Sequence, residues 1–305
     1  MSERYQPTHP IRVVTAASLF DGHDAAINVM RRILQSGGAE VIHLGHNRSA
    51  EDVVTAAIHE DAQAIAVSSY QGGHMEYFRY MRQLLDERGA QHIKLFGGGG
   101  GVIVPDEIAE LQQSGVERIY SPEDGRKLGL VGMIDDLLRR ADFDPAEAAP
   151  TSLAKVEEGD VTAIARMITL AEQDLDHPGR LPEDVRSKLA NGISEYPVPI
   201  VGITGTGGAG KSSLTDELLL RYLMDNPDDR VAVLSIDPTR KRSGGALLGD
   251  RIRMNAIDPK RVFMRSLATR KQKGELSGAI QEAVAVCKAA RYDLIIVETS
   301  GIGQG

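Results

Sequence analysis

The sequence predicts an α/β protein built from two units, each with a parallel sheet between helices. Three observations predict this fold class. Short β-branched runs alternate with amphipathic stretches over residues 11–140, a segment rich in Pro, Ala and Asp follows at 141–152, and a second alternation comes after it. Parallel strands need crossover helices, so this alternation indicates doubly wound sheets. We place a first domain at 1–142, a linker at 143–158 and a second domain at 159–305.

The first domain is predicted to alternate strands and helices along its whole length. Strands are expected at 11–17, 40–45, 64–68, 93–96 and 117–120, and helices at 25–36, 49–60, 75–88, 105–113 and 125–140. This order indicates a doubly wound sheet of the flavodoxin or Rossmann type, in which ligands bind at the carboxyl ends of the strands. His23, Ser68 and Gly97 are expected at those ends.

The second domain is predicted to be a partial P-loop nucleotide-binding α/β domain. Strands are expected at 198–204, 230–236 and 293–298, and helices at 159–175, 182–191, 211–224 and 275–290, with a long connection between residues 236 and 275. No N-K-x-D element, which would select guanine, follows the last strand. We therefore expect the chain to be the N-terminal portion of a longer protein.

Composition narrows the class of partner. The net charge of −8 disfavours binding to nucleic acid or to an anionic membrane, because both need a basic surface. No apolar run approaches the length of a membrane span, and the polar first ten residues do not read as a signal peptide. The single cysteine, Cys287, stands in an apolar helical stretch and is expected to pack in the core. The sequence thus predicts a cytoplasmic protein.

A glycine-rich segment carries the strongest chemical signal. Residues from Gly205 to Ser212 match G-x-x-x-x-G-K-[ST] at every fixed position, between a predicted strand and a predicted helix. The backbone N–H groups of such a loop converge on phosphate oxygens, Lys211 adds a mobile cation as the predicted catalytic residue, and the Ser212 hydroxyl suits Mg²⁺. The predicted nucleotide-binding residues are Gly205, Gly207, Gly208, Ala209, Gly210, Lys211, Ser212, Ser213 and Arg253.

Acidic residues near the loop are candidates for the magnesium site. Glu298 ends the apolar run 294–298, and Asp237 and Asp250 frame a basic, glycine-bearing loop. A strand that ends in Asp and enters such a loop suits a nucleotide-sensing switch, with the acid toward the metal and an Arg toward the phosphates. The basic residues of this loop are equally consistent with a solvated surface.

The stretch after the first strand poses the question of whether His23 is a surface loop residue or a ligand. Asp21 stands two residues earlier, where its carboxylate is placed to accept the Nδ1–H of His23 and leave Nε2 for a metal. A lone histidine in a loop would carry little weight without a wider pattern.

The wider pattern is present, because the region resembles the cobalamin-binding domains of adenosylcobalamin mutases and methionine synthase. Their pattern runs D-x-H-x-x-G, 41 residues, S-x-L, 26 to 28 residues, G-G. Here Asp21-Gly22-His23 is followed by residues 27–67 (41 in number), Ser68, residues 71–96 (26 in number) and Gly97-Gly98, with Ala26 in place of Gly and Tyr70 in place of Leu. The resemblance implies that His23 ligates cobalt, Asp21 orients it and Ser68 meets the benzimidazole tail of the cofactor. It also implies that Gly97 and Gly98 let this tail pass close to the backbone.

The second domain resembles the MeaB/ArgK group of G-protein chaperones for cobalamin mutases. The matching runs are 160–170, the glycine loop, 237–254, 263–270 and 298–304. The resemblance implies a GTP site in which Ser212, Asp237, Asp250 and Glu298 hold Mg²⁺ and Arg253 lies near the nucleotide.

The order of the two domains resembles that of the fused isobutyryl-CoA mutases. It implies adenosylcobalamin-dependent interconversion of isobutyryl-CoA and n-butyryl-CoA, with GTP hydrolysis gating cofactor loading. It further implies an acyl-CoA site in a C-terminal barrel that this sequence does not contain, a homodimer, and an adenosyltransferase that delivers cobalamin. Alternatives are a methyl-transferring or light-sensing cobalamin protein, a receiver joined to a P-loop ATPase, and a separate cobalamin carrier and GTPase that serves another mutase.

Overall fold

The computed structural model resolves the chain into two compact units. The first comprises Met1–Ile58, Ala62–Asp144 and Arg240–Leu247, and the second comprises His59–Asp61, Pro145–Thr239 and Leu248–Gly305. The structure describes residues 4–22, 24–195, 197–237, 245–248, 250–269 and 278–299.

The first unit contains a six-stranded sheet in the order β5-β4-β3-β1-β2-β8. The strands are β1 (Arg12–Ala17), β2 (Glu40–His43), β3 (Ala64–Ser68), β4 (Lys94–Gly98), β5 (Arg118–Tyr120) and β8 (Ala246–Leu248). The first five pair in parallel, which confirms the predicted fold class. The strand order reverses where β1 meets β3, which is the position at which flavodoxin-like sheets bind ligands.

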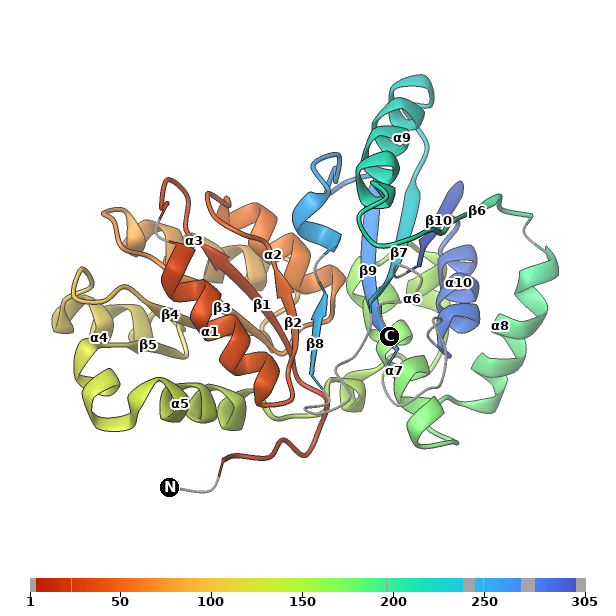
Figure 1. Cartoon of the computed structure of the whole chain (residues 1–305). Helices are drawn as coiled ribbons and strands as arrows, with labels where there is room; N and C mark the ends of the chain where they lie inside the picture. The colour runs from red at the N-terminus through yellow and green to blue at the C-terminus, as the bar shows by residue number, and fades with distance from the viewer. Residues whose placement is uncertain are drawn as a thin grey trace. The chain divides into compact units, whose positions relative to one another are not determined.

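Helices cover both faces of this sheet (Figure 1). They are α1 (Asp24–Ser36), α2 (Ala50–His59), α3 (His74–Glu87), α4 (Pro105–Gln113) and α5 (Pro122–Ala141). On one face Leu34 of α1 and Leu137 of α5 share a core with Phe96 of β4. Ser121 caps the start of α5, with its hydroxyl accepting from the Asp124 N–H at 3.2 Å, and the helix is kinked at Gly129, where φ is 66°.

Strand β8 is an addition that the sequence analysis did not predict. Its Ala246 N–H donates to the Ala39 carbonyl at 3.2 Å, beside β2. The preceding Gly245 allows this approach, because a Cβ there would lie 2.2 Å from the Gln35 carbonyl oxygen. Three residues are too few to show the alternation by which strands are identified in sequences.

The second unit contains a four-stranded sheet in the order β6-β10-β7-β9. Its strands, all parallel, are β6 (Ile200–Ile203), β7 (Val231–Asp237), β9 (Val262–Ala268) and β10 (Leu294–Glu298). The remaining elements are η1 (Pro145–Ala148), α6 (Ala154–Glu157), α7 (Val161–Asp176), α8 (Glu183–Glu195), α9 (Lys211–Asp225), η2 (Asp250–Arg253) and α10 (Ile280–Ala289).

The prediction of three strands in this sheet was wrong, because β9 lies inside the expected long connection. The strand is buried at every position, yet it carries Arg265 and Ser266 in its middle. Arg265 is fully buried and its Nη2 lies 2.6 Å from Glu172 Oε2 on α7. A buried ion pair therefore interrupts the apolar run that would have identified the strand.

The segment predicted as a linker takes part in the core of the second unit. Ala146 of η1, Leu153 and Val156 of α6 are buried in the same cluster as Ile164 of α7. Cys287 of α10 is fully buried, as expected, and burial raises the pKa of its thiol to about 12. In the part of the chain that the structure describes, no helix is long and apolar enough to cross a bilayer.

Candidate functional sites

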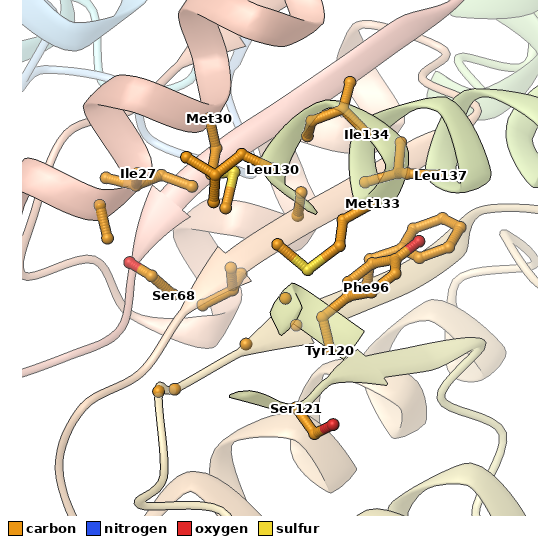
Figure 2. A pocket seen from close by; sticks show the side chains of 18 of the residues that line it. Ile27, Met30, Ser68, Phe96, Tyr120, Ser121, Leu130, Met133, Ile134 and Leu137 are labelled. Carbon is orange, nitrogen blue, oxygen red and sulfur yellow. The ribbon is translucent and has the colours of Figure 1, made fainter. Parts of the chain in front are cut away.

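A cavity of about 220 Å³ opens at the carboxyl ends of β3, β4 and β5. Figure 2 shows the side chains that surround it, with α1 and α5 contributing most of the wall. Its lining includes Ile27, Met30, Ser68, Phe96, Tyr120, Ser121, Leu130, Met133, Ile134 and Leu137, together with residues 97–100. Ligands of parallel α/β sheets bind at this end of the strands, so the cavity is the candidate site of the first unit.

The structure brings Ser68 and Gly98 side by side. They are register partners on β3 and β4. Ser68 is 7% exposed, and its Oγ lacks a hydrogen-bond partner among the described residues. A buried hydroxyl without a partner costs free energy. The hydroxyl is thus placed to donate to a ligand atom in the cavity.

The two predicted tail-slot glycines differ in what surrounds them. A Cβ on Gly97 would lie 2.3 Å from Phe78 Cζ, so that position is filled by the α3 side of the core. A Cβ on Gly98 would meet only the Tyr120 carbonyl oxygen, at 3.5 Å. Both glycines line the cavity, but residues alternate across a strand, so a Cβ on Gly98 would project from the face that carries Phe96 and a Cβ on Gly97 from the opposite face. Of the two, only Gly98 has space for a Cβ.

Asp21 joins the loops that follow β1 and β3. Its side chain is buried, and its Oδ2 accepts from the Tyr70 N–H at 2.6 Å. The Ser18 hydroxyl strengthens the same junction by donating to Ser69 Oγ at 2.9 Å. Asp21 therefore holds the switch point of the sheet together. His23 lies outside the described residues, so its pairing with Asp21 and its role as a cobalt ligand stay predictions.

The loop after β1 adds a candidate that sequence reasoning missed. Phe20 is 80% exposed and has a φ of 63°, a left-handed conformation that is strained for an aromatic residue. Its N–H donates to Asn47 Oδ1 at 2.9 Å, which fixes the loop. Strained residues cluster at ligand sites, so Phe20 is a candidate apolar contact for a ligand above the sheet. An isolated Phe in a turn was the only sequence signal.

The cavity wall on α5 was also missed as a functional feature. Leu130, Met133, Ile134 and Leu137 follow the spacing of one helical face. The same spacing occurs in any helix that covers a sheet, so it predicts a core contact and gives no sign of a cavity.

In the second unit the glycine loop lies between β6 and α9, as the sequence predicts. Gly208 and Gly210 have φ values of 78° and 85°, and Gly210 precedes the first residue of α9. Residues from Thr206 to Ser213 are exposed, apart from half-buried Lys211 and buried Ser212. N–H groups at the start of a helix attract anions, so this loop is a candidate anion-binding site.

Ser212 and Glu298 meet directly. The Ser212 hydroxyl donates to Glu298 Oε1 at 2.6 Å, and the Thr215 hydroxyl donates to Oε2 at 3.0 Å. Glu298 is 1% exposed at the end of β10. Lys211 folds back over the loop, with its Nζ donating to the Gly205 and Thr206 carbonyls at 3.3 and 3.2 Å. These groups are the candidates for holding Mg²⁺ and phosphate oxygens.

The structure describes the other predicted magnesium and nucleotide residues only in part. Asp237 ends β7, beside β10, and is buried. Asp250 begins η2, but its side chain is outside the described ones, and Arg253 ends η2 with an exposed side chain. No cluster of three or more His, Cys, Asp or Glu that could hold a metal occurs among the described residues. A Mg²⁺ ion here would complete its shell with phosphate oxygens and water, as this ion usually does.

Comparison with known proteins also finds two domains in this chain. A model of the B12 binding domain matches residues 11–144, and a model of the methylmalonyl-CoA mutase-associated GTPase MeaB matches residues 164–305. The chain is 59% identical over 307 residues to a fused isobutyryl-CoA mutase of Geobacillus kaustophilus, covering 100% of this chain and 28% of that protein. A fused isobutyryl-CoA mutase of Cupriavidus metallidurans is 62% identical over 300 residues, with 98% and 27% covered. The one from Nocardia farcinica is 58% identical over 305 residues, with 100% and 28% covered.

The chain spans less than a third of the length of these relatives. Apart from residues 59–61 and 240–247, the two units follow the two domain matches, and the cavity and the glycine loop fall one in each. Residues 11–144 therefore match a B12-binding domain and residues 164–305 match a MeaB-type GTPase domain, and over its whole length the chain is similar to fused isobutyryl-CoA mutases.

Proposed function

We propose that this chain carries the cofactor-binding and nucleotide-binding parts of an adenosylcobalamin-dependent acyl-CoA mutase in which GTP hydrolysis gates cofactor loading. The observation that carries the proposal is the cavity beside Ser68, whose buried hydroxyl has no hydrogen-bond partner among the described residues, at the switch point of the sheet that matches the B12 binding domain. The relatives that span this pair of domains are named for isobutyryl-CoA, so the proposed reaction interconverts isobutyryl-CoA and n-butyryl-CoA.

In the first unit the residues fit a corrinoid with a displaced tail. His23 is the proposed cobalt ligand, and Asp21 orients it while holding the Tyr70 N–H. Ser68 donates to the tail base, and Gly98 leaves room for it because no Cβ intrudes. When bound, adenosylcobalamin supplies the radical that starts a carbon-skeleton rearrangement.

In the second unit the residues fit a magnesium nucleotide. Lys211 exchanges the Gly205 and Thr206 carbonyls for phosphate oxygens, and Ser212 and Glu298 exchange their mutual hydrogen bond for the hydrated Mg²⁺. Asp237 and Asp250 are the further proposed magnesium residues, and Arg253 is proposed to reach the nucleotide. The MeaB match supports GTP as this nucleotide.

The remaining parts of the proposal concern partners. The acyl-CoA is proposed to bind a further domain of a longer protein, the protein is proposed to be a cytoplasmic homodimer, and an adenosyltransferase is proposed to deliver the cobalamin. The second candidate function is a cobalamin carrier and GTPase that serves a separate mutase. The full-length protein would then rearrange isobutyryl-CoA only after a separate mutase is added, and that result would favour this second function.

The absorption spectrum of the full chain with adenosylcobalamin tests the first site. The expected spectrum is that of a base-displaced, histidine-ligated cobalt, and His23→Ala is expected to lose it. Asp21→Asn is the matched control, because an amide oxygen still accepts from Tyr70 N–H but orients the imidazole less well. A wild-type chain that takes up no corrinoid would overturn the proposal.

Nucleotide dependence tests the gating. Cobalamin affinity and release are measured on the full-length protein with GDP and with a non-hydrolysable GTP analogue. We expect the two nucleotides to give different values, since γ-phosphate and Mg²⁺ order switch loops in GTPases generally. Identical affinities and release rates with the two nucleotides would contradict the proposed gating. They would not contradict the two proposed binding sites.

A further inference from the structure

Three residues from the first half of the chain pack inside the second unit. His59 ends α2, and Glu60 and Asp61 follow it, yet all three belong to the second unit. They lie within the segment that matches the B12 binding domain and outside the segment that matches the MeaB GTPase. Each of the three is at most 3% exposed. Buried charged groups need partners, so the contacts of these residues indicate what they do.

Glu60 accepts hydrogen bonds from strand β9 and pairs with Arg251. Its Oε2 accepts from the Ser266 N–H at 3.0 Å, and its Oε1 accepts from the Ser266 hydroxyl, also at 3.0 Å. Arg251 Nη1 lies 3.4 Å from Glu60 Oε1, and neither residue is more than 5% exposed. A guanidinium buried this deeply needs a carboxylate, because an uncompensated charge is costly away from water. Glu60 therefore stabilises Arg251 in its buried position.

Arg251 extends these contacts to η2, of which it is the second residue. Its Nη1 also donates to the Met264 carbonyl on β9 at 2.9 Å, and its Nη2 donates to His59 Nδ1 at 3.2 Å. The Met264 N–H donates to the same His59 nitrogen at 3.3 Å, so Nδ1 acts as an acceptor. A planar guanidinium that donates to several acceptors at once has a fixed orientation. Arg251 thus holds η2 against β9.

The residues after η2 are held to the helix that follows the glycine loop. Asp216 of α9 accepts through its Oδ1 from the Asn255 and Ala256 N–H groups, both at 2.8 Å. Helix α9 begins at Lys211, the lysine of the glycine loop. The segment that contains η2 is therefore fastened on two sides, to α9 through Asp216 and to β9 through Arg251.

We infer that Glu60 is a positioning residue of the nucleotide site. It holds Arg251, and Arg251 sets the place of η2, which carries the proposed magnesium residue Asp250 and the proposed nucleotide residue Arg253. The inference rests on the proposed GTP site and adds to it a residue from outside the segment that matches the GTPase family. Segments that respond to γ-phosphate and Mg²⁺ distinguish a nucleoside triphosphate from a diphosphate. Glu60 is therefore expected to influence the affinity for the triphosphate more than the affinity for the diphosphate.

Nucleotide binding to the full-length protein tests the inference. Dissociation constants for GDP and for a non-hydrolysable GTP analogue are measured with Mg²⁺ by titration of fluorescent nucleotides. Glu60→Gln removes the charge at nearly constant volume, and it is expected to weaken binding of the analogue by about 10-fold, the effect of losing one charged hydrogen bond. Binding of GDP, whose phosphates the glycine loop is proposed to hold, is expected to change little.

The decisive value is the dissociation constant of the analogue divided by that of GDP. Partial unfolding of a variant would lower the active fraction for both nucleotides alike and would leave this ratio unchanged. A displaced η2 raises the ratio, because it acts on the triphosphate alone. The ratio therefore separates a positioning role of Glu60 from a purely structural one.

Asp61→Asn is the matched control. Asp61 is 3% exposed, and it accepts from Arg166 Nε at 2.8 Å through Oδ1 and at 2.9 Å through Oδ2. Arg166 lies on α7, whereas Arg251 lies on η2. Asp61→Asn thus also breaks a buried ion pair, in the residue next to Glu60. It is expected to lower the thermal stability, as Glu60→Gln does, but to leave the ratio of the two dissociation constants unchanged.

Arg251→Lys keeps the test decisive if Glu60→Gln does not fold. Lysine retains the positive charge beside Glu60, but its ammonium group cannot reproduce the fork of donors that the guanidinium directs to its acceptors. Arg251→Lys is therefore expected to raise the ratio in the same direction as Glu60→Gln. Circular dichroism and the thermal transition report whether each variant is folded.

The outcomes separate this inference from the proposed function. If the wild-type protein binds neither nucleotide, the proposed nucleotide site fails and the inference fails with it. If the wild-type protein binds both, but folded Glu60→Gln or Arg251→Lys leaves the ratio unchanged, the inference is overturned while the nucleotide site stands. The same conclusion follows if Asp61→Asn raises the ratio as much as Glu60→Gln.

Discussion

Glycines stand at the ligand-binding end of both sheets, but the two units use them for different physical reasons. In the first unit the reason is space: a Cβ on Gly97 would lie 2.3 Å from Phe78 Cζ, and one on Gly99 would lie 2.1 Å from the Ser69 carbonyl oxygen. In the second unit the reason is conformation: Gly208 and Gly210 have positive φ angles, and a Cβ on either would meet nothing within 4 Å.

The difference fits the ligands proposed for the two ends. At the first end the space beside Gly97 and Gly99 is filled by Phe78 and by the Ser69 carbonyl, whereas a Cβ on Gly98 would meet only the Tyr120 carbonyl oxygen. The second end turns successive N–H groups outward, which suits phosphate oxygens. Glycine at a strand end thus indicates close backbone approach in one case and a left-handed turn in the other.

The largest expected effect is that of Gly97→Ala on the stability of the first unit. The new methyl group overlaps Phe78 and Ile119, and overpacking of this kind costs typically 1–3 kcal/mol, here about 3 kcal/mol because the nearest carbon would lie at 2.3 Å. Urea unfolding followed by circular dichroism measures the loss.

Gly98→Ala is the matched control for this prediction. Its methyl group would make an ordinary contact with the Tyr120 carbonyl oxygen, at 3.5 Å, so the stability is expected to change little. Because the methyl group points to the cavity face, cobalamin affinity is expected to fall. Equal destabilisation by the two substitutions would show that the two glycines do not differ in the way the structure indicates.

An intermediate effect is expected at Gly210 in the second unit. Gly210→Ala forces an L-residue to keep a φ of 85°, which costs about 1–2 kcal/mol. Gly210→Asn is expected to cost less, because asparagine adopts the left-handed region more readily. Thermal unfolding without nucleotide compares the two variants.

The same pair of substitutions sharpens the contrast with Gly97. Gly97→Asn is expected to lower the stability at least as much as Gly97→Ala, since the volume of the new side chain causes the loss. If Gly210→Asn and Gly210→Ala destabilise equally, the second unit does not use its glycine for conformation.

The smallest effect is expected from an acid-sensitive contact in the first unit. The Asp142 carboxylate accepts from Tyr5 Oη at 2.7 Å, from the Thr8 N–H at 2.6 Å and from the His9 N–H at 3.0 Å. Burial acts to raise the pKa of Asp142, but these donors outweigh it and the pKa is lowered. Its stabilisation is therefore present above the unfolded pKa of about 3.9 and is lost as the pH falls through the lower folded value.

Asp142→Asn is expected to cost about 1 kcal/mol at neutral pH. It is also expected to flatten the dependence of the melting temperature on pH below about pH 4. Asp174 of the second unit serves as the comparison site, because its pKa is likewise lowered. Its carboxylate accepts from the Leu181 N–H in the turn after α7. If Asp142→Asn leaves the acid profile unchanged, the N-terminal contact does not contribute to it.

Most strands could be predicted because aliphatic runs bounded by polar residues are local features. Strands β1, β3, β7 and β10 are buried at every position, and each was located within a residue or two. Strand β9 could not be predicted, since Arg265 and Ser266 interrupt its apolar run. The buried arginine is accommodated by Thr169 and Glu172 of α7, and Glu172 lies 93 residues away in the sequence. Strand β8 was too short to carry a pattern.

The candidate sites divide in the same manner. The glycine loop, Lys211 and Ser212 were predictable because the pattern is contiguous and has a fixed spacing. Glu298 was predictable as the acid that ends a buried strand, and the structure places it 2.6 Å from Ser212 Oγ. The apolar cavity was not, since its wall comes from α1, α5 and three strands, and each part resembles an ordinary core face.

The sequence by itself determined the alternation of strands and helices, the phosphate loop and the spacing from Asp21 through Ser68 to the paired glycines. These are properties of neighbours along the chain, and local backbone preferences and burial patterns express them directly. Only the tertiary structure decided that a side chain at position 97 would collide with Phe78 while one at position 98 would not, and that the Ser68 hydroxyl has no partner among the described residues. Which face is filled and which is hollow depends on the volumes of side chains brought together from distant parts of the chain, so no single segment encodes it.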